Sequence, residues 1–288
     1  PKTISTFVGS SAGALISACY ASGIKPMDLV EAQISKEKNT AIPPIKYLDV
    51  LKLNGFLPKN SLSNNSIFPN PFGKLYKQLV SSSGFFNTLG LKSYLENNIL
   101  ADNSFENLSN DLFVVATQLD HSRKCIFSKY KYPNPRHDMT ANYYQGISIS
   151  DAVAASMSVP PIYAPHLIKN PHTNEDNYYI DGEIRETLST HAAIDNGCEI
   201  IISSWTHTPY HYKREIGSLT RYGIPAICIQ AIHLMIQKKI ISSRASQATS
   251  REIIDTVSTY FKENKIDEIH RKKILTILEI KLNYNKNV

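Results

Sequence analysis

A short apolar strand that runs through a glycine-rich turn into a helix is the feature that most constrains this chain. The pattern predicts a buried strand over Ile4–Val8 and a helix over Ala12–Ser22. The turn between them, Gly9–Gly13, has the form G-x-S-x-G. A strand, a sharp turn and a helix in this order lift the hydroxyl of the central serine, Ser11, above the sheet.

Ser11 is therefore the candidate nucleophile of an ester-hydrolysing site. Its neighbours two positions before and after, Gly9 and Gly13, are small enough for the chain to turn without a clash. The amide of Ala12 lies at the start of the helix, where N–H groups lack intrahelical partners, and is the candidate oxyanion donor. A glycine-rich turn of this kind also binds phosphate, so the motif alone leaves that alternative open.

Strands that alternate with helices over the first two thirds of the chain predict an α/β fold with a parallel sheet covered on both faces. The further strands are expected at Leu112–Thr117, Cys125–Ser128, Tyr178–Ile180 and Glu199–Trp205. The further helices are expected around Leu75–Val80, at Leu89–Ile99, from a Ser150 cap to Ser158, and at Leu188–Asn196.

The domain organisation follows from the same pattern. Residues 1–223 are expected to form the α/β domain, and residues 224–288 a helical C-terminal extension. Within the domain, residues 36–110 form a long polar excursion that resembles a lid or cap, expected to cover Ser11 with apolar side chains such as Phe85, Phe86 and Leu89.

The first helix of the extension has two possible roles. The apolar residues of Ile224–Met235 nearly encircle it, which predicts burial against the α/β body. The alternative, binding to a membrane surface, requires an exposed apolar face beside Lys238 and Lys239. The apolar run Ile224–Ile236 is too short to span a bilayer, so no integral membrane protein is expected.

Charge and cysteine content exclude some classes. The 31 Lys and Arg outnumber the 25 Asp and Glu, which gives a net charge of +6 and favours anionic surfaces. The four cysteines lie far apart and the histidines show no metal spacing, so we expect no disulfide framework, no metal and no cofactor. No recognised nucleic-acid motif is present, and we expect no nucleic-acid partner.

A serine nucleophile needs a base, and the best candidate is Asp181. It follows the apolar strand Tyr178–Ile180 directly and precedes Gly182, so it sits on a turn at a strand end. An Asp-Gly pair is also an ordinary turn, and the pair alone does not distinguish the two.

In four blocks the chain resembles the bacterial patatin-like phospholipase family. The blocks are Phe7–Leu15, Phe105–Leu108 with Leu112–Thr117 and Cys125–Phe127, Ile149–Ser156 with Val159–Pro160 and Tyr163–Pro165, and Tyr179–Gly182 with Ala192–Ala193 and Gly197–Ser203. Their order and spacing fit over roughly residues 1–205.

The resemblance implies a three-layer α/β/α fold around a mostly parallel sheet. It also implies a lipid acyl hydrolase, of the phospholipase A or esterase type, with a Ser11–Asp181 dyad that works through an acyl-enzyme without metal. The implied partners are phospholipid or another acyl-ester lipid and, peripherally, an anionic membrane. The implied location is cytoplasmic or peripheral to a membrane, and secretion stays open.

Three departures from the family pattern bear on activity. The family's glycine-rich oxyanion loop and first strand precede the nucleophile, but only ten residues precede Ser11 here, so both are expected to be lacking and a sheet edge to be unpaired. Glu183 replaces a second glycine after Asp181-Gly182, which matters if that position needs a positive φ. The segment Thr187–Ser189 replaces the family's Asn-x-Pro.

Two alternative functions remain. One is an α/β-hydrolase esterase with a Ser-His-Asp triad, whose histidine would be His207, after the strand that ends at Trp205. The other is a catalytically inactive lipid-binding or scaffold protein of the patatin-like family, which the departures would explain.

Overall fold

The computed structural model describes residues 4–35, 40–46, 50–54, 83–131, 140–170, 174–185, 187–206, 208–264 and 266–284. The strands are β1 (Thr6–Ser10), β2 (Lys52–Leu53), β3 (Phe86–Asn87), β4 (Asp111–Gln118), β5 (Arg123–Phe127), β6 (Ala141–Tyr144), β7 (His166–Lys169) and β8 (Asp176–Asp181). The helices are α1 (Ala12–Ala21), α2 (Pro26–Ile34), α5 (Leu89–Asn98), α6 (Ile149–Ser156), α7 (Thr190–Asp195), α8 (Gly223–Glu263) and α9 (Glu268–Tyr284), with 3₁₀ helices η1 (Gly182–Ile184) and η2 (Leu219–Tyr222).

The main sheet has the order β6-β5-β4-β8-β7, and β1 also pairs with β4. Among the described strands, β1–β4 and β5–β6 are parallel, whereas β4–β5, β4–β8 and β7–β8 are antiparallel. The sheet is thus mixed, and parallel pairing is confined to two of its pairs because β4–β5 and β7–β8 are connected as hairpins. The α/β class and the helical C-terminal extension are confirmed.

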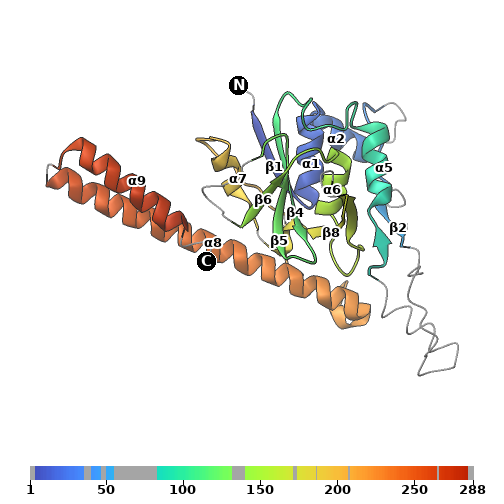
Figure 1. Ribbon diagram of the computed structural model, residues 1–288. Coiled ribbons are helices and arrows are strands. Elements are labelled where there is room, and N and C mark those ends of the chain that lie inside the picture. Colours follow the sequence, from blue (N-terminus) through green and yellow to red (C-terminus); the bar gives the residue numbers. More distant parts are fainter. Residues whose placement is uncertain are drawn as a thin grey trace.

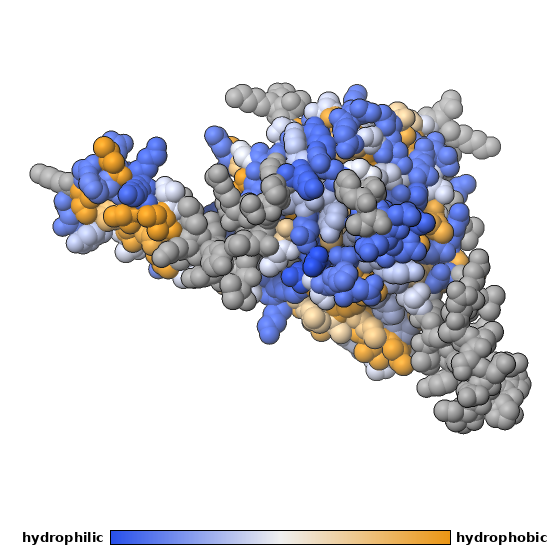
Figure 2. Space-filling model, in the orientation of Figure 1, coloured by the Kyte–Doolittle hydropathy of each residue, from blue (hydrophilic) through white to orange (hydrophobic). Residues whose placement is uncertain are grey.

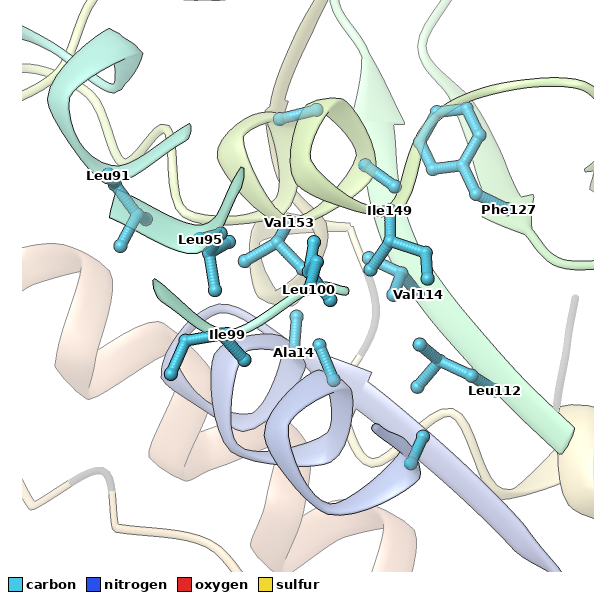
Figure 3. Packing of buried hydrophobic residues seen from close by; sticks show 14 of the residues in the cluster. Ala14, Leu91, Leu95, Ile99, Leu100, Leu112, Val114, Phe127, Ile149 and Val153 are labelled. Carbon is cyan, nitrogen blue, oxygen red and sulfur yellow. The ribbon is translucent and has the colours of Figure 1, made fainter. Parts of the chain in front are cut away.

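The central strand β4 is covered on both faces, which explains its uninterrupted apolar sequence. Leu112, Val114 and Ala116 belong to the larger hydrophobic cluster with residues of α1, α5 and α6, and Figure 3 shows this packing. Phe113 and Val115 point to the opposite face, in a second cluster that includes Ala192 of α7. The helices therefore lie on both faces of the sheet, as the α/β/α layering predicts (Figure 1).

Two local expectations from the sequence are wrong. The helix that we expected to be capped by Ser150 begins two residues earlier: Ser148 is the N-cap of α6, and its side chain accepts a hydrogen bond from the amide of Asp151. The segment Glu199–Trp205 forms no strand, and Ile200 and Ile202 are 85% and 89% exposed. Its β-branched composition favours a strand, but a strand also needs a neighbouring strand to pair with.

The first half of α8 runs along the α/β body, and its second half projects with α9 as a long arm (Figure 1). The predicted burial of the Ile224–Met235 face is wrong, because Ile224, Ile227 and Met235 are 75%, 47% and 58% exposed. The helix is also longer than its apolar core suggested. By length and composition alone, Leu219–Glu263 is long and apolar enough to cross a membrane, although the sequence analysis expected no such segment.

The polar excursion is described only in part. Its predicted helix at Leu75–Val80 lies outside the described residues, whereas the predicted helix at Leu89–Ile99 is confirmed as α5. The start of α5 lies beside the segment after α6, since Thr88 Oγ1 is 3.4 Å from Ser158 Oγ. That Phe85, Phe86 and Leu89 cover Ser11 stays a prediction.

Candidate active site

Ser11 lies on a sharp turn between β1 and α1. Its φ of 54° and ψ of −131° fall in a region that non-glycine residues rarely adopt, so the backbone is strained as a nucleophile turn requires. A Cβ atom at Gly9 would lie 2.5 Å from the carbonyl oxygen of Gly13, so the predicted need for glycine at Gly9 is confirmed. Gly13 is under no such constraint, because a Cβ atom there would have no neighbour within 4 Å.

The topology of the sheet brings Asp181 to Ser11. Strands β1 and β8 pair with β4 end to end: Ser10 lies opposite Val115, and Asp181 lies opposite Ala116, the next residue of β4. Since β1 runs parallel and β8 antiparallel to β4, their carboxyl ends meet head-on beside it. Ser11 and Asp181 are 170 positions apart in the sequence (181 − 11). They are brought together because the ends of their strands pair with adjacent residues of β4, Val115 and Ala116.

Gly182 allows this close meeting. A Cβ atom at Gly182 would lie 2.5 Å from the carbonyl oxygen of Val115 and 2.7 Å from Ser10 Oγ. Backbone atoms cannot move away as a flexible side chain can, so only glycine fits between the two strand ends. This steric constraint explains why the turn after the candidate base, Asp181, needs a glycine at Gly182.

The carboxyl group of Asp181 is poised to take a proton. It is 1% exposed, and burial raises its pKa to about 6, while the nearby Ser11 hydroxyl and a hydrogen bond from the Glu183 amide act in the opposite direction. The Glu183 amide donates to Oδ1 at 2.8 Å, whereas Oδ2 has no hydrogen-bond partner among the described residues. An unpartnered, buried carboxylate oxygen beside a serine is the arrangement a general base needs.

Comparison with known proteins bears on this geometry. A patatin-like phospholipase family model matches residues 2–194, about two thirds of the chain. The chain belongs to the patatin-like phospholipase family. A search of curated proteins finds no match.

Two serines of α6 and the segment after it hold the strand ends of this patatin-like domain in place. Ser156 Oγ accepts a hydrogen bond from the amide of Ser11 at 2.8 Å and donates one to the carbonyl of Val115 at 2.6 Å. The carbonyl of Ser158 accepts a hydrogen bond from the amide of Asp181 at 3.0 Å. The sequence analysis assigned neither serine a role, because each acts through a contact that only the fold creates.

Glu183, the departure from the family's second glycine, fits the backbone. It lies in η1 and is not among the residues with positive φ, so no glycine is needed there. Its effect is electrostatic. Burial and then the neighbouring Asp181 charge raise the pKa of Glu183 to about 7, and the Ser10 hydroxyl and Lys239 of α8 lower it in part.

A partly buried polar cluster joins three elements of the α/β body. His166 Nε2 lies 3.0 Å from Asp151 Oδ1 and its Nδ1 lies 3.0 Å from Thr88 Oγ1, while Lys92 Nζ donates to Asp151 at 2.7 Å. The order of these groups resembles a hydroxyl-histidine-aspartate triad, but Thr88 is 2% exposed and out of reach of a substrate. The cluster therefore joins α5, α6 and β7 rather than forming a second site, and no sequence motif signals it.

The remaining site predictions have these outcomes. The amide of Ala12 lies at the N-terminus of α1, where it has no intrahelical partner, as expected for an oxyanion donor. His207, the histidine of the triad alternative, lies outside the described residues. Among the described residues, no group of three or more histidine, cysteine, aspartate or glutamate side chains could hold a metal ion.

Proposed function

We propose that this chain is a lipid acyl hydrolase in which Ser11 is the acylated nucleophile and Asp181 the general base. The observation that carries the proposal is the head-on meeting of β1 and β8 beside Val115 and Ala116, which brings a strained serine and a buried, half-partnered carboxylate together. Membership in the patatin-like phospholipase family supports the lipid substrate class.

Acylation begins when Ser11 Oγ attacks the ester carbonyl carbon and its proton moves to Asp181 Oδ2. The carbonyl oxygen becomes an oxyanion, which the Ala12 amide and the positive end of α1 stabilise. When the tetrahedral intermediate collapses, the bond from carbon to the alcohol oxygen breaks, and the proton on Asp181 passes to that oxygen. A lysolipid or another alcohol leaves, and the fatty acyl group remains on Ser11.

Deacylation reverses the proton path with water as the nucleophile. Asp181 accepts a proton from water as the water oxygen attacks the acyl carbon. Collapse of this second intermediate breaks the bond to Ser11 Oγ, which takes the proton back, and the free fatty acid leaves. The hydrogen bond from the Ser11 amide to Ser156 Oγ holds the turn of Ser11 through both steps.

The proposed substrates are phospholipids or other acyl-ester lipids, and the proposed location is the cytoplasm or the periphery of an anionic membrane. The net charge of +6 supports the anionic partner. No metal or nucleic acid takes part in the proposed reaction, so hydrolysis of a p-nitrophenyl ester is expected to continue in EDTA.

The decisive experiment is covalent labelling with a fluorophosphonate probe. The purified chain is incubated with the probe, and the modified peptide is sequenced by mass spectrometry, which separates Ser11 from the adjacent Ser10. We expect the label on Ser11, none on Ser11→Ala, and much slower labelling of Asp181→Asn. Ser93→Ala, which removes a half-buried serine on α5, is the control and is expected to label normally.

Two results would contradict the proposal. Labelling of Asp181→Asn at the normal rate would remove the base assigned here. Failure of Ser11 to label in a folded protein that binds lipid would place the chain in the inactive lipid-binding class.

A further inference from the structure

The first half of α8 is apolar on two opposite faces, but the α/β body covers only one. Ile236 and Ile240, 3% and 4% exposed, form the covered face. On the opposite side, Ile227, Leu234 and Ile241 recur at helical spacing and are 47%, 49% and 61% exposed. We call this opposite side, with Ile224 and Met235 at its margin, the outer face of α8. Figure 2 shows an apolar area where the first half of α8 runs under the body in Figure 1.

A helix with two opposite apolar faces is normally covered on both of them. The outer face is therefore a candidate contact surface rather than an ordinary solvated one, because several large apolar side chains lie together on it. Three kinds of occupant could cover it: a lipid surface, a second copy of the chain, or a bilayer core into which the helix inserts.

The charges around the outer face favour a lipid surface. Residues 216–250 contain no aspartate or glutamate, whereas the same stretch contains the cations Arg221 and Lys238, and also Lys239 and Arg244, which contact the body. A second copy would bring two basic surfaces together and is disfavoured by repulsion. An anionic lipid surface accepts the apolar side chains between its headgroups and attracts the basic ones.

A second exposed apolar stripe, on α2, shows why the charges matter. Met27, Val30 and Ile34 are 61%, 45% and 75% exposed, so α2 matches α8 in exposed apolar side chains. However, Asp28 and Glu31 lie on the same helix. Negative side chains beside an apolar stripe oppose binding to an anionic surface, and α2 is the natural control for α8.

The first half of α8 lies beside the catalytic turn, because Lys239 joins α8 to η1. Its Nζ donates to the carbonyls of Ile184 and Arg185, the residues that follow the turn of Asp181, and its charge faces Glu183. Arg244, one and a half turns further along α8, stacks over the ring of Trp205 at 4.3 Å. These contacts hold α8 against the body. The helix therefore stays beside the active site when its outer face rests on a lipid surface.

We propose that the outer face of α8 docks on an anionic lipid surface and thereby holds Ser11 at the interface where its substrate resides. The substrate part of this inference rests on the proposed function, but the docking itself does not require catalysis. Binding is therefore measured with Ser11→Ala, so that loss of docking and loss of hydrolysis are separate results.

The test is co-sedimentation of the purified chain with vesicles of phosphatidylcholine alone or of phosphatidylcholine with phosphatidylserine. We expect binding to the anionic vesicles, weaker binding to the neutral ones, and release as salt is raised. The variant Ile227→Asp/Leu234→Asp is expected to bind at least about tenfold more weakly, because two apolar side chains no longer enter the lipid. The control Ile34→Asp, on α2, is expected to bind like the parent. Both substitutions replace exposed side chains, and thermal melts check that the fold is retained.

Hydrolysis by the active chain gives a second readout. Ile227→Asp/Leu234→Asp is expected to hydrolyse a soluble p-nitrophenyl ester at the parent rate but vesicle phospholipid at least about tenfold more slowly. Hydrolysis that fails on both substrates in the parent, with docking intact, would refute the proposed function and leave the docking proposal standing.

Four results would overturn the docking proposal. These are equal binding by the Ile227→Asp/Leu234→Asp variant, an equal loss in Ile34→Asp, a dimer in size-exclusion chromatography that the α8 variant dissociates, and vesicle-bound chain that resists alkaline carbonate. The third result would assign the outer face to a second copy, and the fourth to a membrane-spanning helix.

Discussion

The charge on Asp181 is expected to destabilise the fold that positions it. The carboxyl group is buried and one of its oxygens has no partner among the described residues, so the ionised form is poorly solvated. Replacing Asp181 with asparagine keeps the shape and the acceptor for the Glu183 amide but removes the charge. The variant is therefore expected to be inactive and, at neutral pH, more stable than the parent.

The size and the pH dependence of this effect follow from the raised pKa. In the unfolded chain the carboxyl group loses its proton near its ordinary pKa of 3.8, but in the folded chain it keeps the proton up to about pH 6. Between these values the folded state binds more protons, so the stability of the parent falls as pH rises from about 4 to about 6. A pKa raised from 3.8 to about 6 corresponds to about 3 kcal/mol at pH 7 and above.

Asp181→Asn lacks this titration, so its advantage over the parent should grow over that window and then stay constant. A gain of about 3 kcal/mol corresponds to a rise in Tm of about 6–12 °C. Any fixed cost of the new amide group shifts the whole curve but not its dependence on pH. The acylation rate of the parent should fall on the acid side with the same apparent pKa, because a protonated Asp181 cannot accept the Ser11 proton.

The assay is thermal denaturation of parent and variant in parallel at pH 4, 5, 6, 7 and 8, values chosen to bracket the pKa of about 6. Fluorophosphonate labelling of the parent is followed over the same series. A difference in Tm that is the same at every pH would show that Asp181 titrates at its ordinary value in the folded chain, and the reasoning from burial would fail.

Three further positions, Gly182, Ser156 and Asp151, are tested by substitution. Gly182→Ala is expected to lower the free energy of unfolding by about 1–3 kcal/mol and to abolish labelling, because its Cβ would clash with the Val115 carbonyl. The control Gly13→Ala should leave Tm nearly unchanged, because a Cβ atom there has no neighbour within 4 Å. Thermal melts compare the two variants. Ser156→Ala leaves the buried Ser11 amide without its acceptor and should cost about 1–3 kcal/mol and slow labelling, with Tm and labelling rate as readouts. Burial alone would raise the pKa of Asp151, but hydrogen bonds from His166 and Lys92 hold it well below its usual range, so Asp151→Asn should lower Tm at pH 7 and lose this effect as the pH falls below about 4. A Tm difference that does not shrink in acid would contradict this last assignment.

The sequence predicted those features that local pattern determines. The helix over Leu89–Ile99 and the central strand over Leu112–Thr117 are confirmed to within a residue or two. Each has an uninterrupted apolar face or run, and burial in the core fixed its conformation. The turn at Ser11 was equally predictable, because a Cβ atom at Gly9 would clash with the carbonyl of Gly13 and the turn therefore needs glycine there.

Features that depend on distant partners escaped prediction. Glu199–Trp205 has the composition of a strand, yet strand formation depends on a pairing edge that composition does not report. Ser156 looks like one more small residue of a helix, and its contact with the Ser11 amide exists only because α6 crosses β4 at Val115. The antiparallel course of β8 was likewise invisible, although it is what brings Asp181 to Ser11.

Glu183 shows how a departure from a family pattern changes a site without breaking it. As a backbone position it needs no glycine, and its amide serves Asp181 as any non-proline residue would. Its carboxyl group, however, adds a second negative charge two residues after Asp181. The positive charge of Lys239 partly offsets this charge. Lys239 comes from α8, so the C-terminal helix contributes to the charge balance of the active site as well as to the surface beside it. Replacing Lys239 with methionine would leave two neighbouring carboxyl groups without that cation, and the pKa of Glu183 would rise further.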